Sequence, residues 1–241
     1  MENISYIGLS QQVALTSMMN VTANNIANMS TPGYKGQRTL FVDYLNKGKD
    51  AGPKDAIHQV QDYATYRDTT QGSLQMTSNP LDIALEGKGY FAVTTPTGTA
   101  YTRNGSFALN AQGQLITKQG YPVQGDGGAE LTIPEDAKHI TISPDGQVST
   151  EQGEVGVIKV ADFADQQSMQ EMGDGLYTAT GAEIPVENVR VVQSAVEGSN
   201  VNPILEMNRM VEVLRAYQST YRMLTNDHER IRGAIQKLTR V

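Results

Sequence analysis

Histidine, serine and acidic side chains are the residues of this 241-residue chain whose types could support catalysis or metal binding. The three histidines, His58, His139 and His228, are far apart in sequence, and no two of them share the short spacing of a metal site. No serine occupies a Gly-x-Ser-x-Gly elbow, the strained turn that exposes a hydrolase nucleophile. The chain has no cysteine, which excludes a thiolate nucleophile and a disulfide framework.

Two motifs resemble a cofactor-binding or catalytic site, but the sequence around them does not fit such a site. Residues 87–92 match the loose dinucleotide fingerprint, but that motif must open a helix, and Val93-Thr94-Thr95 continues a strand pattern. Asp82 and Glu86 flank one short strand like a glycosidase pair, but the chain has no tryptophan to serve as a sugar platform. We therefore predict no enzyme, no catalytic, cofactor-binding or metal-binding residue, and no small-molecule substrate.

The strongest pattern in the chain is a seven-residue apolar repeat near its C-terminus. It steps by three and four residues through Met207, Met210, Leu214, Tyr217, Tyr221, Leu224, His228, Ile231, Ile235 and Leu238. This repeat predicts a long helix with a narrow apolar face, here called the predicted seam. At 1.5 Å per residue, residues 203–241 would span roughly 58 Å. A helix of that length cannot cover its seam on a small domain, so it requires a partner helix.

A weaker repeat near the N-terminus offers that partner. It covers residues 3–28 and ends at Ser30-Thr31-Pro32-Gly33, where proline stops a helix. Asn24, Asn25 and Asn28 interrupt it, although asparagine is a poor helix former. These three residues indicate either a fraying helix end or amides directed at a neighbouring chain. We predict that the two terminal helices pair as a coiled-coil-like unit.

The middle of the chain has a different period. Short alternating runs separated by turn signals, among them Asn104-Gly105, indicate an antiparallel β domain inserted between the helices. The predicted fold class is α+β. The predicted helical assembly domain is discontinuous and comprises residues 1–35 and 203–241. An extended connector at 36–80 leads to a β-rich domain at 81–190, and a return connector follows at 191–202.

Composition narrows the possible partners. The net charge is −7 and no basic tract is present, which disfavours nucleic-acid binding. The ends are neutral to basic and the middle is acidic. No segment is long and apolar enough for a membrane span, so we predict no direct membrane insertion. The N-terminus lacks the pattern of a cleaved signal peptide, and on composition alone the protein would be placed in the cytosol.

Four motifs in order resemble the bacterial flagellar rod and hook protein family. They are Asn24–Asn28 with Ser30–Lys35, Gln71–Leu74 with Asn79–Leu85 and Gly87–Phe91, Tyr101–Phe107, and Glu197–Asn202 with Glu206-Met207 and Arg215–Tyr217. The resemblance covers both ends and the first half of the middle, whereas residues 125–190 add little. One departure is Val213-Leu214 before Arg215, where the family pattern places a glutamine.

The resemblance implies a structural subunit of the flagellar basal-body rod, a tubular drive shaft that transmits motor torque. Length and the single β domain favour a proximal rod protein, with a distal rod protein as the alternative. The implied partners are copies of itself, other rod subunits and the flagellar type III export apparatus. The implied location is the periplasmic rod, reached without a cleaved signal peptide. A hydrolase with an oligomerising helical unit and a membrane-surface protein are the competing interpretations from other classes.

Residues on the predicted seam and in the asparagine cluster are the candidate assembly contacts. Tyrosine is enriched at protein interfaces, because its ring is buried while its hydroxyl finds a partner. The predicted contact residues are Asn24, Asn25, Asn28, Tyr34, Met207, Met210, Leu214, Tyr217, Tyr221 and Leu224.

Overall fold

The protein divides into two compact units, each built from separate stretches of the chain. The computed structural model describes residues 2–46, 57–134, 136–137, 139–186 and 190–238, with residues 2–5, 42–46 and 57–63 described by their backbone alone. Unit 1 comprises Met1–Ala27, Gln37–Asp68 and Asn202–Val241, and unit 2 comprises Asn28–Gly36 and Thr69–Val201. The chain therefore passes between the units four times.

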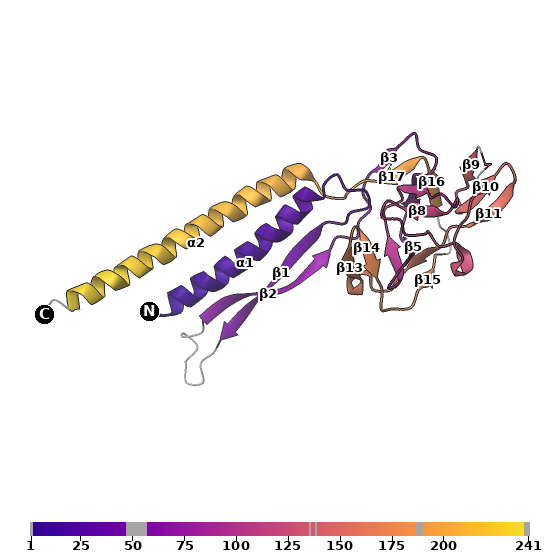
Figure 1. Ribbon diagram of the computed structural model, residues 1–241. Coiled ribbons are helices and arrows are strands. Elements are labelled where there is room, and N and C mark those ends of the chain that lie inside the picture. The colour runs from indigo at the N-terminus through magenta and orange to yellow at the C-terminus, as the bar shows by residue number, and fades with distance from the viewer. Residues whose placement is uncertain (1, 47–56, 135, 138, 187–189, 239–241) are drawn as a thin grey trace. The chain divides into compact units, whose positions relative to one another are not determined.

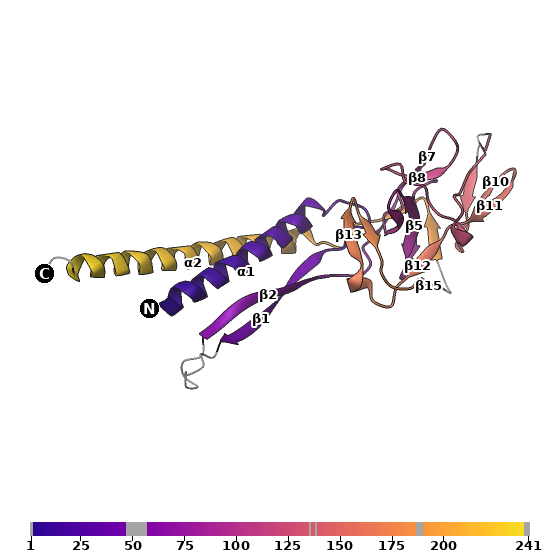
Figure 2. The same ribbon diagram turned by 60° about the horizontal axis from the view of Figure 1, so that its bottom comes forward.

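Unit 1 consists of two helices and a long hairpin. The helices are α1 (Glu2–Ala27) and α2 (Pro203–Leu238), and the strands are β1 (Gln37–Asn46) and β2 (Ile57–Arg67). Helix α1 lies between α2 and the hairpin, and it contacts all three of the other elements (Figures 1 and 2). The hairpin is antiparallel, from Gln37 opposite Arg67 to Asn46 opposite Ile57.

The start of α2 follows from its first residues. The Asn202 side-chain oxygen accepts hydrogen bonds from the Ile204 and Leu205 backbone N–H groups at 3.1 and 3.3 Å. These bonds satisfy two of the N–H groups that a helix leaves without partners at its N-terminus. Pro203 is the first helical residue, where its fixed φ is favourable and its missing N–H costs nothing. Glu206 lies in the first turn and Lys237 in the last, as the helix dipole favours.

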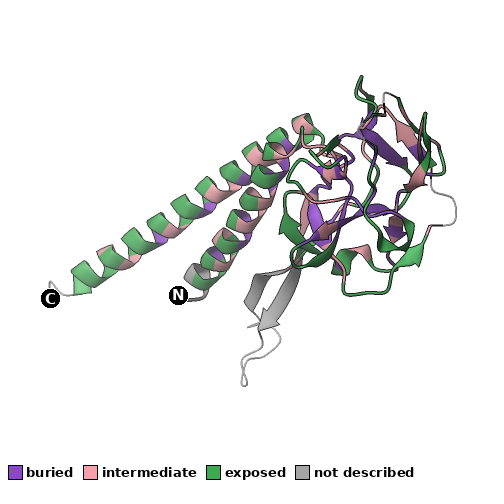
Figure 3. Cartoon of the chain, turned by 45° about the vertical axis from the view of Figure 1, so that its right-hand side comes forward, coloured by how far each residue is buried: buried purple, intermediate pink, exposed green. Residues whose placement is uncertain are grey.

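The predicted coiled-coil-like pair is wrong, although the α+β class is confirmed. The row of α2 that is buried consists of Glu206, Val213, Thr220 and Asp227. It lies one residue before the predicted row of Met207, Leu214, Tyr221 and His228, which are exposed. Most of α2 is exposed, with isolated buried positions along it (Figure 3). The prediction was wrong because it took the most apolar row of α2 to be the row that is buried within the subunit.

Polar side chains are tolerated in the buried row because several have partners there. Glu206 accepts a hydrogen bond from Asn25 of α1, and Asp227 accepts one from Arg230. Close approach of the helices is helped by Gly8, where a Cβ atom would lie 2.6 Å from Cδ2 of Leu224. The terminal helices are thus joined by small and polar residues and supported by a hairpin, which is not the interdigitated apolar seam of a coiled coil.

The hairpin occupies part of the segment 36–80, for which the sequence predicts an extended connector. Its strands lack a clear two-residue apolar alternation and contain several charged residues, so the usual strand signal is weak. The strand pair is interrupted by one irregularity between Leu40 and Phe41. Its formation shows that pairing along a long ladder and packing against a helix can override a weak local pattern.

Unit 2 is a β structure with short strands. Its six-stranded antiparallel sheet has the order β13 (Gln170–Gly173), β14 (Leu176–Thr178), β6 (Gly98–Thr102), β5 (Tyr90–Thr95), β12 (Val160–Asp162) and β15 (Ile184–Pro185). A three-stranded sheet has the order β11 (Gly153–Val157), β10 (Gln147–Thr150) and β9 (Ile140–Ile142). Three strand pairs complete the described part of the unit: β16 (Arg190–Gln193) with β4 (Ile83–Glu86), β17 (Ala195–Glu197) with β3 (Leu74–Met76), and β7 (Phe107–Leu109) with β8 (Leu115–Thr117).

Two apolar clusters hold unit 2 together. The larger one includes Ile83, Phe91, Val93, Leu115 and Val123, all with almost no exposed surface. The smaller one lies on the other face of β5, where Tyr90 and Ala92 alternate with the residues of the larger cluster. Strand β5 is therefore the central element of the unit, buried on both faces.

Candidate functional site

An exposed apolar row along the first half of α2 is the clearest candidate for a binding surface. Ile204, Met207, Val211, Leu214 and Tyr221 follow one another by three, four, three and seven residues, and their exposed fractions range from 42% to 68%. This spacing places them on one side of the helix, beside the buried row. We call these five residues the outer row. An exposed apolar strip of this kind, interrupted at Gln218, is unusual on a surface that stays in water.

Helix α1 carries a shorter exposed row. Tyr6, Leu9 and Val13 follow at three and four residues, and each is between 56% and 59% exposed. We call them the α1 row. Unit 1 thus presents apolar side chains on two different helices, while the contact between those helices is partly polar.

Three further residues of the predicted seam lie between the buried row and the outer row. Met210, Tyr217 and Leu224 are partly buried. Tyr217 and Tyr221 line a hollow of about 440 Å³ on α2, together with Gln218 and Arg222. The hollow has aromatic and polar walls, a combination that can receive a side chain from another molecule.

The asparagine cluster separates into residues with different surroundings. Asn25 is buried, and its side chain joins three elements of unit 1: its amide N–H groups bond to the Gln37 carbonyl at 2.8 Å and to Glu206 Oε2 at 3.3 Å, and its oxygen accepts the Gln37 N–H at 2.9 Å. Asn24 is exposed, and Asn28 is partly buried and bonded to Thr31. Tyr34 is buried in unit 2, with 5% of its surface exposed.

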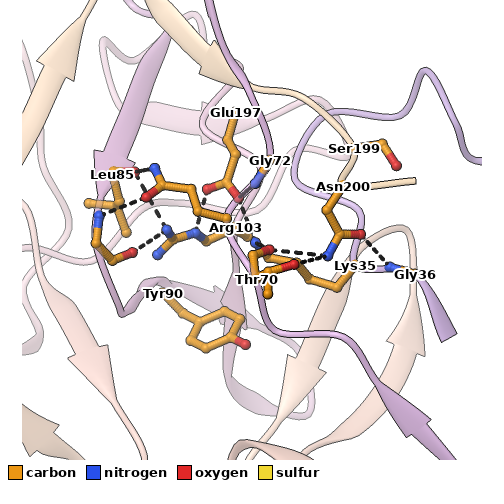
Figure 4. A network of polar contacts seen from close by, with 12 residues as sticks. Lys35, Gly36, Thr70, Gly72, Leu85, Tyr90, Arg103, Glu197, Ser199 and Asn200 are labelled. Atoms are coloured by element: carbon orange, nitrogen blue, oxygen red, sulfur yellow. Dashed lines mark hydrogen bonds and ion pairs between the residues drawn. The ribbon is translucent and has the colours of Figure 1, made fainter. Parts of the chain in front are cut away.

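A buried ion cluster in unit 2 was not anticipated from the sequence. Glu197 lies at the end of β17 and is 1% exposed. Its Oε1 accepts hydrogen bonds from Lys35 Nζ at 2.5 Å and from the Gly72 N–H at 3.0 Å, and its Oε2 accepts one from Arg103 Nε at 2.6 Å (Figure 4). Both cations are at least 96% buried, so one carboxylate holds two positive charges out of water. We call Glu197, Lys35 and Arg103 the Glu197 cluster.

Backbone groups satisfy the remaining donors of the cluster. The Arg103 guanidinium also donates to the carbonyl oxygens of Gly87 and Gly89, and Lys35 Nζ donates to the Thr70 carbonyl at 2.8 Å. A charged group that leaves water is tolerated only when it is paired and hydrogen-bonded in this way. The chain must come close at this point: a Cβ atom on Gly72 would lie 2.0 Å from the Gly198 carbonyl oxygen.

Asn200 extends the network (Figure 4). Its side-chain oxygen accepts the Gly36 N–H at 2.7 Å, and its amide nitrogen donates to the Thr70 carbonyl at 3.1 Å. The available signal in the sequence was a lone charge in each of several motifs, such as Glu197 directly after the apolar Ala195-Val196. Which charges meet could not be predicted, because they come from segments far apart in the chain.

A second, more exposed ion pair lies beside β6. Glu183 accepts hydrogen bonds from Tyr101 at 2.5 Å and from Lys159 at 3.0 Å. Burial, reinforced by the hydrogen bond to Glu183 and by its charge, raises the pKa of the Tyr101 hydroxyl far above its ordinary 10.0. Partial burial of Glu183 acts to raise its pKa, but the hydrogen bonds from Lys159 and Tyr101 and the charge of Lys159 lower it below its ordinary 4.5.

The described residues contain no arrangement suited to catalysis. No group of three histidine, cysteine or acidic residues capable of holding a metal ion occurs among them. A cavity of about 340 Å³ borders the Glu197 cluster at Lys35, Arg103 and Tyr90, but the donors of both cations already serve Glu197 and backbone oxygens. Neither α1 nor α2, within the part of the chain that is described, has an apolar stretch long enough to cross a membrane.

Comparison with known proteins identifies the family. Three family models match: "Flagella basal body rod protein" at residues 6–35, "Flagellar hook protein FlgE/F/G D1 domain" at 84–150 and "Flagellar basal body rod FlgEFG protein C-terminal" at 192–237. The flagellar basal-body rod protein FlgF of Caulobacter vibrioides is 34% identical over all of both chains. The chain belongs to the flagellar basal-body rod protein family.

Other members of the rod family are similar over slightly less of the chain. FlgF of Mesorhizobium japonicum is 33% identical over 91% of each chain. FlgG of Caulobacter vibrioides is 34% identical over 90% of this chain and 92% of its own. The predictions of a structural rod subunit and of a role that is not enzymatic are confirmed by this family membership. As a rod subunit, the protein works by assembling with other rod proteins in the flagellar basal body.

Proposed function

We propose that the subunit polymerises into the rod through unit 1, with the outer row as its main contact surface. The observation that carries the proposal is the exposure of this row, because an apolar strip on a long helix is stable in water only when another surface covers it. The hollow at Tyr217 and Tyr221 provides an anchor point near the end of the row. Met210 and Leu224 flank it and complete the contact.

The α1 row supports an open assembly. A contact between the outer row of one copy and the α1 row of the next joins two different surfaces, and such a contact is heterologous. A heterologous contact whose rotation does not close produces a helical array, which is the geometry of a tube. The asparagines Asn24 and Asn28, near the end of α1, would then meet a neighbouring subunit, while Asn25 and Tyr34 act from within by positioning the elements around them.

Membership of the rod family supports a route to the assembly site. We infer export through the flagellar type III apparatus without a cleaved signal peptide, and assembly in the periplasm without insertion into the membrane. The similarity to FlgF over the full length of both chains supports a proximal position in the rod, with a distal position as the alternative. A unit 1 whose helix contact is partly polar, as at Asn25 and Glu206, is suited to this route, because such a unit can be unfolded for export and stabilised again by docking.

The proposal is tested by placing charges at the hollow, where the outer row ends at Tyr221. The double variant Tyr217→Asp/Tyr221→Asp should keep unit 2 folded and be absent from purified basal bodies, since two carboxylates would be desolvated in the contact. The matched control is Ser219→Asp/Asn226→Asp, which adds the same charge at two exposed positions on the side of α2 opposite Tyr217 and Tyr221. Normal rods and motility with the tyrosine variant, or equal loss with both variants, would exclude the outer row as the contact surface.

A further inference from the structure

The Glu197 cluster lies where the chain passes between the two units. The chain leaves or enters unit 2 at the ends of three segments: Asn28–Gly36, the start of Thr69–Val201, and the end of Thr69–Val201. Lys35 belongs to the first segment, Gly72 to the second and Glu197 to the third. All three meet at one carboxylate (Figure 4).

Backbone hydrogen bonds join the same segments a second time. The Gly33 N–H donates to the Glu197 carbonyl at 2.8 Å, and the Gly198 N–H donates to the Ser73 carbonyl at 2.8 Å. Asn200 then links Gly36 to Thr70. Each segment is therefore bonded to both of the others within a few residues of its exit from unit 2.

Arg103 connects this meeting point to the sheet. It lies directly after β6, and its guanidinium reaches the turn between β4 and β5 through the Gly87 and Gly89 carbonyl oxygens. Arg103 therefore ties the three segments to the turn that leads into β5, the central buried strand of unit 2. The cluster has two positive charges to one negative charge, so loss of the Glu197 charge would leave two buried cations unpaired.

We propose that Glu197 is a positioning residue that anchors the segments connecting the two units, and that this anchor bears the load when the rod turns. The load-bearing part rests on the proposed function as a rod subunit. Force applied to unit 1 passes into unit 2 through these covalent connections, whose ends are held in place by the bonds of the Glu197 cluster. Buried, charge-assisted hydrogen bonds at the ends resist such force better than exposed ones, because water cannot replace them as they lengthen.

The test is Glu197→Gln in the full-length protein. The amide has the same shape but directs N–H groups toward Lys35 or Arg103, both of which are donors. Hydrogen exchange at the Gly33, Gly36 and Gly72 amides should accelerate by about a hundredfold, while exchange at β5 stays within a few-fold of the parent. The control Glu183→Gln removes a more exposed ion pair of the same unit and should leave both groups of amides unchanged.

The functional arm uses motors that contain the variant. Glu197→Gln should be present in purified basal bodies and should support rotation without load, but rotation should be lost at high viscous load. Three outcomes would each overturn the proposal. Exchange could accelerate equally in β5 and at the three glycines, exchange at the glycines could stay unchanged, or rotation under load could match that of the parent. Absence of the parent protein from basal bodies would instead refute the proposed function.

A second variant keeps the test decisive if Glu197→Gln does not accumulate. Asn200→Ala removes the bonds to Gly36 and Thr70 and changes no residue of the Glu197 cluster. Exchange at the Gly36 amide should then rise by about tenfold, as expected for the loss of one hydrogen bond, and exchange at Gly72 should change less. Unchanged exchange at Gly36 would contradict the anchor.

Discussion

Asn25 shows how one buried amide can organise a unit. Its side chain bonds both backbone groups of Gln37, at the start of β1, and also reaches Glu206 in the first turn of α2. One residue therefore sets the relation of α1, the hairpin and α2. Asparagine suits this position because its amide offers a donor and an acceptor in the geometry of a peptide group.

We predict that Asn25→Ala destabilises unit 1 by about 2–3 kcal/mol, because it removes the three hydrogen bonds that the buried side chain makes to Gln37 and Glu206. The matched control, Asn24→Ala, changes an exposed neighbour on the same helix and should have an effect within about 0.5 kcal/mol. Urea unfolding followed by the helical circular dichroism signal measures both. Equal effects of the two substitutions would show that the Asn25 network contributes nothing specific.

The pair of Tyr101 and Glu183 predicts how the stability of unit 2 depends on pH. The folded-state pKa of Glu183 is lowered, so its contribution is present above the ordinary value of 4.5 and is lost as the pH falls below it. The folded-state pKa of Tyr101 is raised, so its contribution is present below 10.0 and is lost as the pH rises above that value.

Tyr101→Phe separates the two limbs of this profile. The phenylalanine cannot ionise, so the loss of stability above pH 10 should become smaller, while a loss below pH 4.5 remains. Thermal unfolding of unit 2 across the pH range measures both limbs. An unchanged alkaline limb would mean that other groups cause it.

At the scale of elements, α2 presents two neighbouring rows with opposite roles. The buried row contains only one apolar side chain, Val213, and the outer row contains Val211, two residues away. Val213 is 4% exposed and Val211 is 46% exposed. This pair of valines offers a comparison in which residue type and helix are the same and only the environment differs.

We predict that Val213→Ala destabilises unit 1 by about 2 kcal/mol, from the lost burial of two methyl groups and the cavity they leave. Val211→Ala should change the stability of the isolated subunit by less than about 0.5 kcal/mol, and should instead weaken assembly. Chemical unfolding and the recovery of basal bodies measure these two effects. If Val211→Ala destabilised the isolated subunit more than Val213→Ala, the row of Met207 and Leu214 would be the contact within the subunit.

The helices and strands also show which parts of the fold could be predicted from the sequence. Both terminal helices, the α+β class and the start of α2 at Pro203 could be predicted, since caps and long repeats act locally. The side of α2 that is buried could not, because apolar content alone does not distinguish a contact within the subunit from a contact between subunits. The hairpin and the Glu197 cluster were missed because both depend on pairings between segments that lie apart in sequence.

At the scale of the whole molecule, charge is divided unequally between the units. Unit 2 holds 7 of the 19 lysine and arginine residues but 16 of the 26 aspartate and glutamate residues. In a helical array every copy of unit 2 lies at the same distance from the axis. Because every copy carries the same negative net charge, neighbouring copies repel one another. Unit 1 carries the remaining charges and is slightly basic.

We predict that moderate salt promotes polymerisation of the purified subunit. Repulsion between copies of unit 2 is screened as the Debye length falls from about 30 Å at 0.01 M to about 10 Å at 0.1 M salt, whereas apolar contacts along α2 are not weakened. Light scattering across this range measures the effect. Polymerisation that is slower at 0.1 M than at 0.01 M would indicate attraction between opposite charges as the main driving force.

The most direct test of the central claim places a photo-crosslinking amino acid at Tyr221, on the outer row, and separately at Ser219, on the other side of α2. Intact basal bodies that contain either variant are irradiated, and the subunits are separated under denaturing conditions. The account predicts covalent products with a second rod subunit from position 221 and none from position 219. Products from position 219 alone would contradict it, because they would place the contact between subunits on the opposite side of the helix.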